Sequence, residues 1–528
     1  MIRLRLSFIV VALLLVFQGG IPAQVPGPLD GLDAYIRKAM ADWQIPGLAV
    51  AVVKDGKVVF LRGYGVRQVG TTARVDENTM FEIGAASRSL AATAVAMLVS
   101  DGKLAWDDPV IKYVPWLEFA DPFVTRHVTL RDLLSHRVAG GWAGTADAFV
   151  GMFAHTPQEI LRALAWRPSV GRLPGPGRSA AEFRSRFLVE STNYFAAAEV
   201  IAAVTGTPYK EFVQSRILRP LKMASAVTGA RDLWYDRAVA PCFECGIGNH
   251  TVTLDDARVA NVAARHRRGE RGPETIPVFD TGDGASGLWL SAADAARWLL
   301  LQTGGGTIDG IRLLSARVFD ETHTAQVSIA PETDLRPSGG TLGAFGLGWF
   351  LTDYHGRHLS FHAGAGTAFT ALLRDERVGV AVLTNAAPNE LREALAFRVL
   401  DALIGVPPRD WSAEMLESAR RREGEARLRA AAAPPPPPPA AAPLPLSAYV
   451  GTYSHPAFGD VSVIFENDRL VLRIDRGQIG DLVSLGDHRF RVTWRGPDHY
   501  RGVVTFATRD SRSEQLTLQF PGVTFTRK

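Results

Sequence analysis

A run of six consecutive prolines, Pro434 to Pro439, divides this 528-residue chain into two parts. Proline lacks a backbone N–H and fixes φ, so the run cannot continue a helix or lie inside a sheet. With the alanines around it, it predicts an extended, semi-rigid spacer, which we interpret as a linker rather than as a ligand for a proline-binding domain. The segments before and after this spacer must therefore each fold around a core of their own.

The first residues have the layout of a secretory signal peptide. Arg3 and Arg5 precede an apolar run over residues 8–17, and small residues ending at Ala23 follow. The run is too short to span a bilayer, so residues 1–23 are expected to be a cleaved signal peptide, with an uncleaved anchor as the minority alternative. We expect a periplasmic or secreted protein that has no membrane span after cleavage.

Charge and cysteine content argue against several kinds of partner. The net charge is only +4 and no basic run has interleaved aromatics, so we expect no nucleic-acid partner. Cys242 and Cys245 are the only cysteines, and whether they form a local disulfide stays open. A zinc site would need two further ligands where only His250 lies nearby, so neither a metal nor another cofactor is expected.

Strand and helix patterns before the spacer predict an α+β domain over residues 28–405. A hairpin is predicted at residues 47–64, with its turn at residues 54–57. Helical patterns and Gly- and Pro-rich loops follow it. Strand patterns then return at residues 345–351, 358–364, 369–374 and 378–383, before a helix at 390–404. We therefore expect the two ends of this domain to share one antiparallel sheet.

The remainder of the chain is predicted to be a connection and a second domain. Residues 406–445 combine a charged helix with the Pro/Ala-rich linker. Residues 446–528 are dense in short alternating runs separated by turns such as Glu466-Asn-Asp468. This pattern predicts a small all-β domain, either a barrel or a sandwich.

Several stretches between residues 30 and 405 resemble the β-lactamase-like serine hydrolases, the group of class C β-lactamases, DD-peptidases and related esterases. The stretches that carry the resemblance are Phe81-Glu-Ile-Gly84 and residues 98–110, 129–137, 183–187 and 366–385. The segment after the spacer resembles a small β-domain that is often fused behind such hydrolases. The resemblance implies a β-lactamase/DD-peptidase-like fold, in which helices flank an antiparallel sheet and form a helical subdomain.

The resemblance implies a Ser-x-x-Lys motif at the start of a helix, and this chain has lost both of its reactive residues. The serine position holds Ala85, which has no nucleophilic atom, and the lysine position holds Arg88. A guanidinium cannot accept the proton of a nucleophile as a lysine amine can. The catalytic chemistry of the motif is therefore expected to be absent.

The second motif of the family, Tyr-x-Asn, matches Val189-Glu190-Ser191. The tyrosine that would act as acid or base is thus Val189, and Ser191 occupies the asparagine position. A shifted frame would recruit Asn193 or Tyr194, but it breaks the match downstream.

The third motif persists as His362-Ala363-Gly364, which corresponds to Lys/His-x-Gly on the strand beside the cleft. The resemblance implies that His362 is a donor facing the substrate, with Gly364 beside it. It also implies that the backbone N–H groups of Ala85 and Ala365 form an oxyanion hole, which a change of side chain does not remove. A carbonyl-binding site is therefore expected to persist.

Two functions remain open. In the favoured one, the protein is a pseudoenzyme whose cleft binds a small molecule or peptide, such as an ester or a cell-wall fragment. In the other, it is an active esterase, peptidase or β-lactamase that uses Ser87, Ser89 or an activated water. His136 and Arg137 are expected to set turns and to satisfy backbone groups.

Overall fold

A computed structural model gives the structure of residues 27–138, 156–166, 183–229, 233, 261–269, 272–276, 287–329, 340, 342–364, 366–432, 438–474, 478–495, 502–519 and 523–528. Residues 1–23, for which a signal peptide is expected, lie outside these residues, as do the two cysteines, Ala365 and most of the proline run, so the statements made about them stay predictions. Within the described residues, no helix combines the length and the apolar character needed to cross a membrane.

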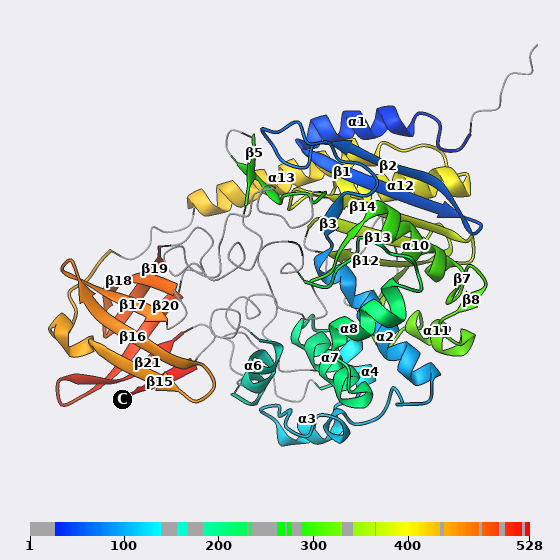
Figure 1. Cartoon of the computed structure of the whole chain (residues 1–528). Helices are drawn as coiled ribbons and strands as arrows, with labels where there is room; N and C mark the ends of the chain where they lie inside the picture. Colours follow the sequence, from blue (N-terminus) through cyan, green and yellow to red (C-terminus); the bar gives the residue numbers. More distant parts are fainter. Residues whose placement is uncertain are drawn as a thin grey trace, which may run out of the picture.

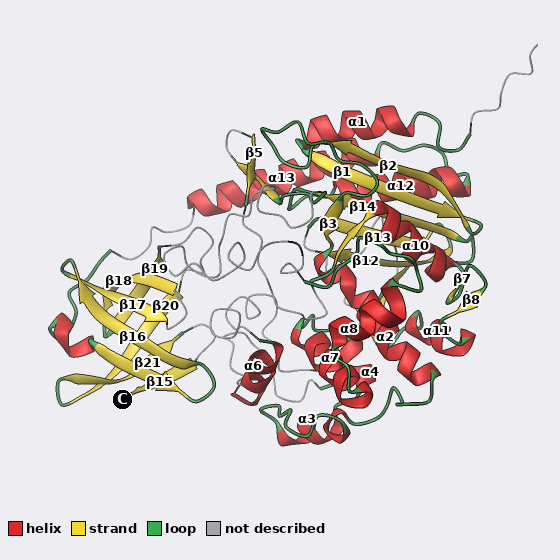
Figure 2. Ribbon diagram, viewed as in Figure 1, coloured by secondary structure: helices red, strands yellow, loops and turns green. Residues whose placement is uncertain are grey.

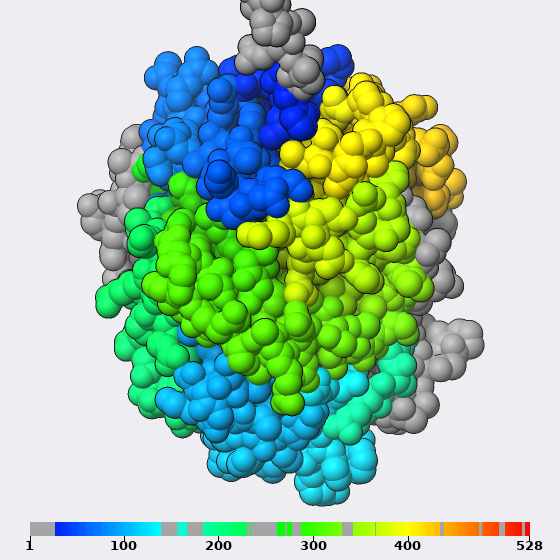
Figure 3. Space-filling model, turned by 90° about the vertical axis from the view of Figure 1, so that its right-hand side faces the viewer, coloured from blue at the N-terminus to red at the C-terminus, as the bar shows by residue number. Residues whose placement is uncertain are grey.

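The first domain is built on an eight-stranded antiparallel sheet (Figure 1). Its strands are, in spatial order, β2 (Lys57–Gly65), β1 (Gly47–Lys54), β14 (Val378–Thr384), β13 (Ala368–Leu373), β12 (Arg357–Gly364), β11 (Phe350–Tyr354), β10 (Gly343–Phe345) and β9 (Val327–Ser328). The β1–β2 turn has positive φ at Asp55 (49°) and Gly56 (75°), as a tight hairpin needs. Because β1 pairs with β14, the two ends of the domain share the sheet, and this prediction is confirmed. Figure 3 shows the same neighbourhood on the surface, where the N-terminal part (blue) lies against residues near 400 (yellow).

Both faces of the sheet are covered by helices, because the side chains of each strand alternate between two cores (Figure 2). On β1, Leu48, Val50 and Val52 belong to one core and the residues between them to the other. The first core includes α1 (Leu32–Trp43), α12 (Leu391–Ile404) and the start of α13 (Trp411–Ala432). The second includes α2 (Arg88–Ser100), α10 (Ala292–Thr303) and α11 (Ala316–Thr322).

A helical subdomain packs beyond α2. Its elements are η1 (Gly84–Ser87), η2 (Val110–Lys112), α3 (Pro122–His127), α4 (Leu130–Leu134), α6 (Pro157–Arg162), η3 (Ala163–Trp166), α7 (Thr192–Thr205), α8 (Tyr209–Val213) and η6 (Gln214–Leu218). Three two-stranded sheets join β3 (Met80–Glu82) to β6 (Trp289–Ser291), β4 (His266–Gly269) to β5 (Gly272–Thr275), and β7 (Thr307–Ile308) to β8 (Ile311–Arg312). The α+β class predicted for this domain is confirmed.

One predicted strand is wrong. Residues 345–351 were expected to form a single strand, but β10 ends at Phe345 and β11 begins at Phe350. Gly348 in the connection has φ of 84°, and a Cβ there would lie 2.9 Å from the Arg88 carbonyl oxygen. The chain therefore leaves the sheet in order to pass close to α2.

The charged helix after residue 405 is α13, and its first turns belong to the first domain. Trp411 and Leu416 are buried with α1 and α12. The Trp411 indole donates to Asp401 Oδ2 at 2.6 Å, and the Trp43 indole donates to Ser412 Oγ at 3.1 Å. Packing thus extends the first domain past the boundary at residue 405.

The second domain is a closed barrel of eight antiparallel strands, which confirms the barrel alternative. The strands are β15 (Gly451–His455), β16 (Gly459–Glu466), β17 (Arg469–Ile474), β18 (Gln478–Gly486), β19 (Arg489–Trp494), β20 (Gly502–Arg509), β21 (Arg512–Leu518) and β22 (Val523–Arg527), preceded by η10 (Leu446–Tyr449). Closure comes from the pairing of β22 with β15. Tyr449, Tyr453, Phe490 and Phe506 are buried in its core.

Candidate functional site

The turn that carries Ala85 connects β3 to α2. The Ile83 N–H donates to the Leu288 carbonyl at 3.0 Å, and Gly84 then takes a φ of 48°. Ala85 is half-buried, whereas the residues that follow it are buried. Its side chain is a methyl group, so the position that the resemblance assigns to a nucleophile presents only carbon here.

The two serines beyond Ala85 are turned into the helix. Ser87 Oγ donates to the Gly84 carbonyl, and Ser89 Oγ donates to the Ala86 carbonyl at 2.9 Å. Their residues are only 2% and 3% exposed, respectively. Each hydroxyl is therefore bonded to the backbone three residues earlier and withdrawn from solvent, which disfavours both as nucleophiles.

Gly364 brings β12 against this turn. A Cβ at Gly364 would lie 1.7 Å from the Ile83 carbonyl oxygen and 2.6 Å from the Ala86 nitrogen. Thr367 Oγ1 adds a hydrogen bond to the Glu82 carbonyl at 2.8 Å. Only glycine permits this approach, so the glycine of the third motif has a packing reason that does not depend on any ligand.

Arg88 links the first motif to the second. Its Nη2 donates to Ser191 Oγ at 2.7 Å, and Ser191 directly precedes α7. The guanidinium carbon lies 5.5 Å from the centre of the Tyr194 ring. The structure therefore brings Arg88 and Ser191 together, while Val189 is 39% exposed.

The shifted frame finds no support in the geometry. The Tyr194 hydroxyl is buried and donates to the Leu134 carbonyl at 2.7 Å. Burial raises the pKa of Tyr194 above its ordinary value. Asn193 is also buried, at 3% exposure. Tyr194 thus serves the packing of α7 rather than proton transfer.

His136 is the site neighbour whose position the sequence did not predict. It is fully buried, and its Nε2 lies 3.5 Å from Arg88 Nη1. Its Nδ1 accepts the Glu190 N–H at 3.0 Å, and its carbonyl accepts the Leu188 N–H at 2.9 Å. Burial, and then the Arg88 charge, lower the pKa of His136 well below its ordinary value, so the ring is neutral. It does satisfy backbone groups, and they belong to the segment that carries the second motif.

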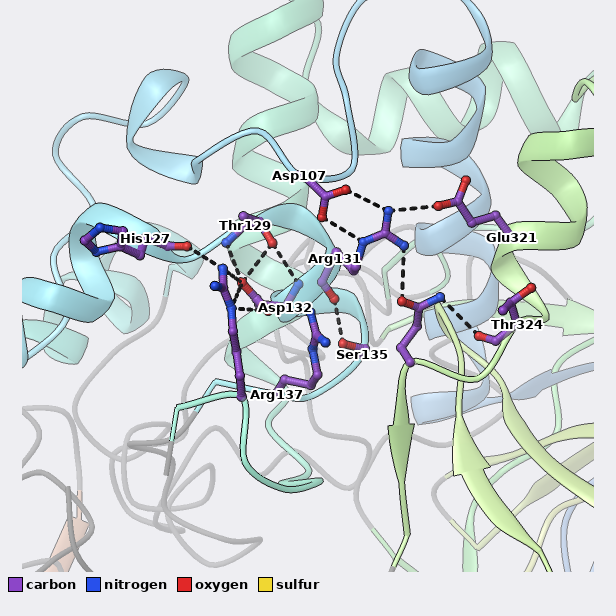
Figure 4. Close-up of polar contacts among 11 residues, drawn as sticks. Asp107, His127, Thr129, Arg131, Asp132, Ser135, Arg137, Glu321 and Thr324 are labelled. Carbon is purple, nitrogen blue, oxygen red and sulfur yellow. Dashed lines mark hydrogen bonds and ion pairs between the residues drawn. The ribbon is translucent and has the colours of Figure 1, made fainter. Parts of the chain in front are cut away.

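Asp132, which lies on α4, also holds this segment (Figure 4). Its buried carboxylate accepts from Thr129 Oγ1 at 2.8 Å, from Arg137 Nη2 at 2.7 Å and from Arg184 Nη2 at 2.7 Å. The Arg184 N–H in turn donates to the Arg137 carbonyl at 2.8 Å. The Thr129-x-x-Asp132 spacing is a capping-box pattern visible in the sequence, but the bond from Arg184 is a long-range contact that the pattern does not reveal.

Arg131 forms a second polar cluster on α4. Figure 4 shows its guanidinium between Asp107 and Glu321, to which it bonds at 2.8 Å each. A further bond reaches Gln326 at 3.1 Å. These contacts join the helical subdomain to α11 and to the residues before β9.

His362 lies on β12, two residues before Gly364, and is 1% exposed. Its Nδ1 is 2.8 Å from the Ala363 carbonyl oxygen. Burial, and then the positive charge of Arg88, lower the pKa of His362 to about 3. A donor at His362 was expected, but the one N–H of the neutral ring is directed at its own backbone.

No resident metal site can be assigned. Among the residues that the structure describes, no group of three or more His, Cys, Asp or Glu side chains is placed to hold an ion. The absence of a metal and of other cofactors stays a prediction.

Known proteins resemble both domains. A family model described as Beta-lactamase matches residues 32–404, and one described as Domain of unknown function (DUF3471) matches residues 435–527. Unguisins hydrolase ungD of Aspergillus violaceofuscus is 26% identical over 486 residues, covering 85% of this chain and 79% of that protein. Penicillin-binding protein 4 of Amycolatopsis lactamdurans is 26% identical over 351 residues, covering 65% and 81%. The octameric penicillin-binding protein homologue from Pyrococcus abyssi has the same fold, with a TM-score of 0.57 at 21% identity over 92% of this chain and 97% of that one.

Proposed function

Because this chain belongs to the β-lactamase family, we propose that it is a pseudoenzyme: it keeps the carbonyl-binding cleft of the family without the covalent chemistry. One observation carries the proposal. Ala85 stands where the family has its nucleophile, and the hydroxyls of Ser87 and Ser89 are bonded to backbone carbonyls within a buried turn. No described hydroxyl in this turn can attack a carbonyl held at Ala85.

The replacement at position 88 supports the same proposal. A lysine there would supply an amine able to exchange a proton, but Arg88 stays charged and is bonded to Ser191. Val189 offers no ionisable group. The expected ligand is a small molecule or peptide with a carbonyl group, such as an ester or a cell-wall fragment.

The name of one relative favours a second candidate function, that of a hydrolase whose nucleophile lies elsewhere than at position 85. Unguisins hydrolase ungD matches most of this chain, and its name describes a hydrolase. A water molecule or a serine outside the Ala85 turn would then have to act. A covalent probe separates the serine mechanism from the pseudoenzyme.

The first prediction is that the protein forms no adduct with a fluorophosphonate or a penicillin, as measured by intact mass. The reason is that Ala85 has no oxygen to acylate. The matched control is the triple variant Ala85→Ser, Arg88→Lys, Val189→Tyr, which restores the three family residues and should gain either one phosphonyl group, with release of fluoride, or the mass of one penicillin molecule. An adduct on the unaltered protein would refute the pseudoenzyme, and peptide mapping would then identify the nucleophile.

A further inference from the structure

The hydrogen-bonding character of His362 can be derived from its contacts. A carbonyl oxygen only accepts, so the 2.8 Å contact between His362 Nδ1 and the Ala363 oxygen places the ring proton on Nδ1. In the neutral ring, Nε2 then carries a lone pair and no proton. His362 therefore offers an acceptor to anything that approaches it.

This acceptor has no partner among the residues that the structure describes. His362 Nε2 is buried and makes no hydrogen bond there. Its ring lies between aromatic and charged neighbours: the Phe350 ring centre is 5.3 Å away, and Arg88 is close enough to affect the titration of His362. Buried acceptors are normally satisfied, so an orphan nitrogen in a binding site indicates a ligand or water group that completes it.

Protonation of Nε2 is not an alternative way to satisfy it. The Arg88 guanidinium disfavours a second positive charge, and burial disfavours any charge on the ring. His136 has the opposite pattern, because its Nδ1 accepts the Glu190 N–H and its proton is therefore on Nε2. The two histidines near Arg88 thus have fixed and different roles.

We infer that His362 selects ligands that present an N–H or O–H donor, such as a primary amide or an alcohol, over ligands that present a carboxylate. The inference deepens the proposed carbonyl-binding function and rests on it. A carboxylate at this point would place its lone pairs against the lone pair of Nε2, whereas an amide N–H would complete the acceptor. Because Nε2 is buried, the donor group of a ligand must displace its present neighbours in order to reach it.

The test compares benzamide with benzoate, which have similar size and differ in whether the polar group donates. Binding is followed by NMR of protein labelled with ¹⁵N-histidine at neutral pH. We expect benzamide to bind at least about tenfold more tightly and to shift the His362 Nε2 resonance in the direction of a hydrogen-bonded nitrogen. His323 is an internal control, because Ser360 and Gln302 already engage both of its nitrogens, and its resonances should not move.

A variant gives the converse result. His362→Lys replaces the acceptor by a group that only donates, so its preference should invert towards benzoate. Benzoate binding as tight as benzamide on the unaltered protein would overturn the inference while leaving the cleft in place. Failure of both compounds to shift any resonance of His362 would instead count against the proposed cleft. The measurement on the unaltered protein decides even where the variant does not fold.

Discussion

Ala85 and Arg88 act together at the scale of single residues. With Ala85, the chain lacks the nucleophilic oxygen at the serine position of the first motif. Arg88 has a longer side chain than a lysine, and it bonds Ser191 of the second motif. Either change alone would leave one reactive residue of the Ser-x-x-Lys motif. With both changes, the turn has no reactive residue and keeps a permanently charged side chain bonded to Ser191. Two neutral histidines, His136 and His362, are buried near this charge.

A buried neutral histidine makes stability depend on pH. The folded-state pKa of His362 is about 3, below the unfolded value of roughly 6.5, so the unfolded chain takes up a proton first as pH falls. Stability from this group is complete above about pH 6.5 and is lost as pH falls towards 3. Between pH 7 and pH 5 we expect His362 to cost about 2 kcal/mol of unfolding free energy.

Urea unfolding of His362→Gln at both pH values checks this expectation. The variant should lose less stability between pH 7 and pH 5 than the unaltered protein. His358→Gln is the matched control, because His358 is on the same strand with its side chain 96% exposed, so the difference between the two variants isolates the effect of burial. An identical pH dependence for all three proteins would contradict the buried neutral ring.

At the scale of elements, α4 holds the segment in front of α7. Asp132 bonds Arg137 and Arg184, and His136 receives the Glu190 N–H. This attachment holds the segment that carries Ser191 next to Arg88. The second motif is therefore positioned by residues of an element some fifty residues earlier in the chain.

Removing the Asp132 carboxylate should loosen that segment. Asp132→Ala leaves two arginines without their buried partner, and we expect a loss of about 3 kcal/mol in urea unfolding. Hydrogen exchange should also accelerate at the amides of Leu188 and Glu190. Asp107→Ala is the control: its carboxylate is 67% exposed and bonds Arg131, so its removal should cost under about 1 kcal/mol. Equal effects of the two variants would remove the special role given to Asp132.

Local patterns predicted the elements of the first domain well, and long-range contacts account for what they missed. The hairpin, the strands β12 to β14 and α12 follow from alternation, turn residues and helical periodicity. The break between β10 and β11 depends on the approach of Gly348 to α2, which no local pattern contains. In the site, the replacements at Ala85 and Arg88 are visible in the sequence. The position of the proton on His362 depends on a backbone contact, so it is not visible in the sequence.

At the scale of the whole molecule, the first domain continues into α13 before the linker begins. Trp411 is 4% exposed and Leu416 is 6% exposed, both against α1 and α12. The second domain closes on itself through β15 and β22. It also shares a hydrophobic cluster with Ala163 at the start of η3, so the two domains are in contact.

A chain of residues 27–432 should therefore be much more stable than a chain of residues 27–404. The shorter chain loses the burial of Trp411 and Leu416, and we expect a loss of roughly 3–5 kcal/mol relative to the longer one. Thermal unfolding of the two proteins measures the difference. Because both lack the barrel, the comparison isolates α13, and equal melting temperatures would restore the boundary at residue 405.

The pairing of β1 with β14 also determines when this domain can form. Leu48 on β1 lies opposite Thr384 on β14. Strand β1 therefore pairs with β2 early, but it can pair with β14 only once nearly all of the domain has been synthesised. Contacts so distant along the chain slow folding, because a long loop must close before they stabilise anything. During synthesis β1 therefore lacks this second neighbour, and its apolar residues stay accessible to chaperones until β14 has been made.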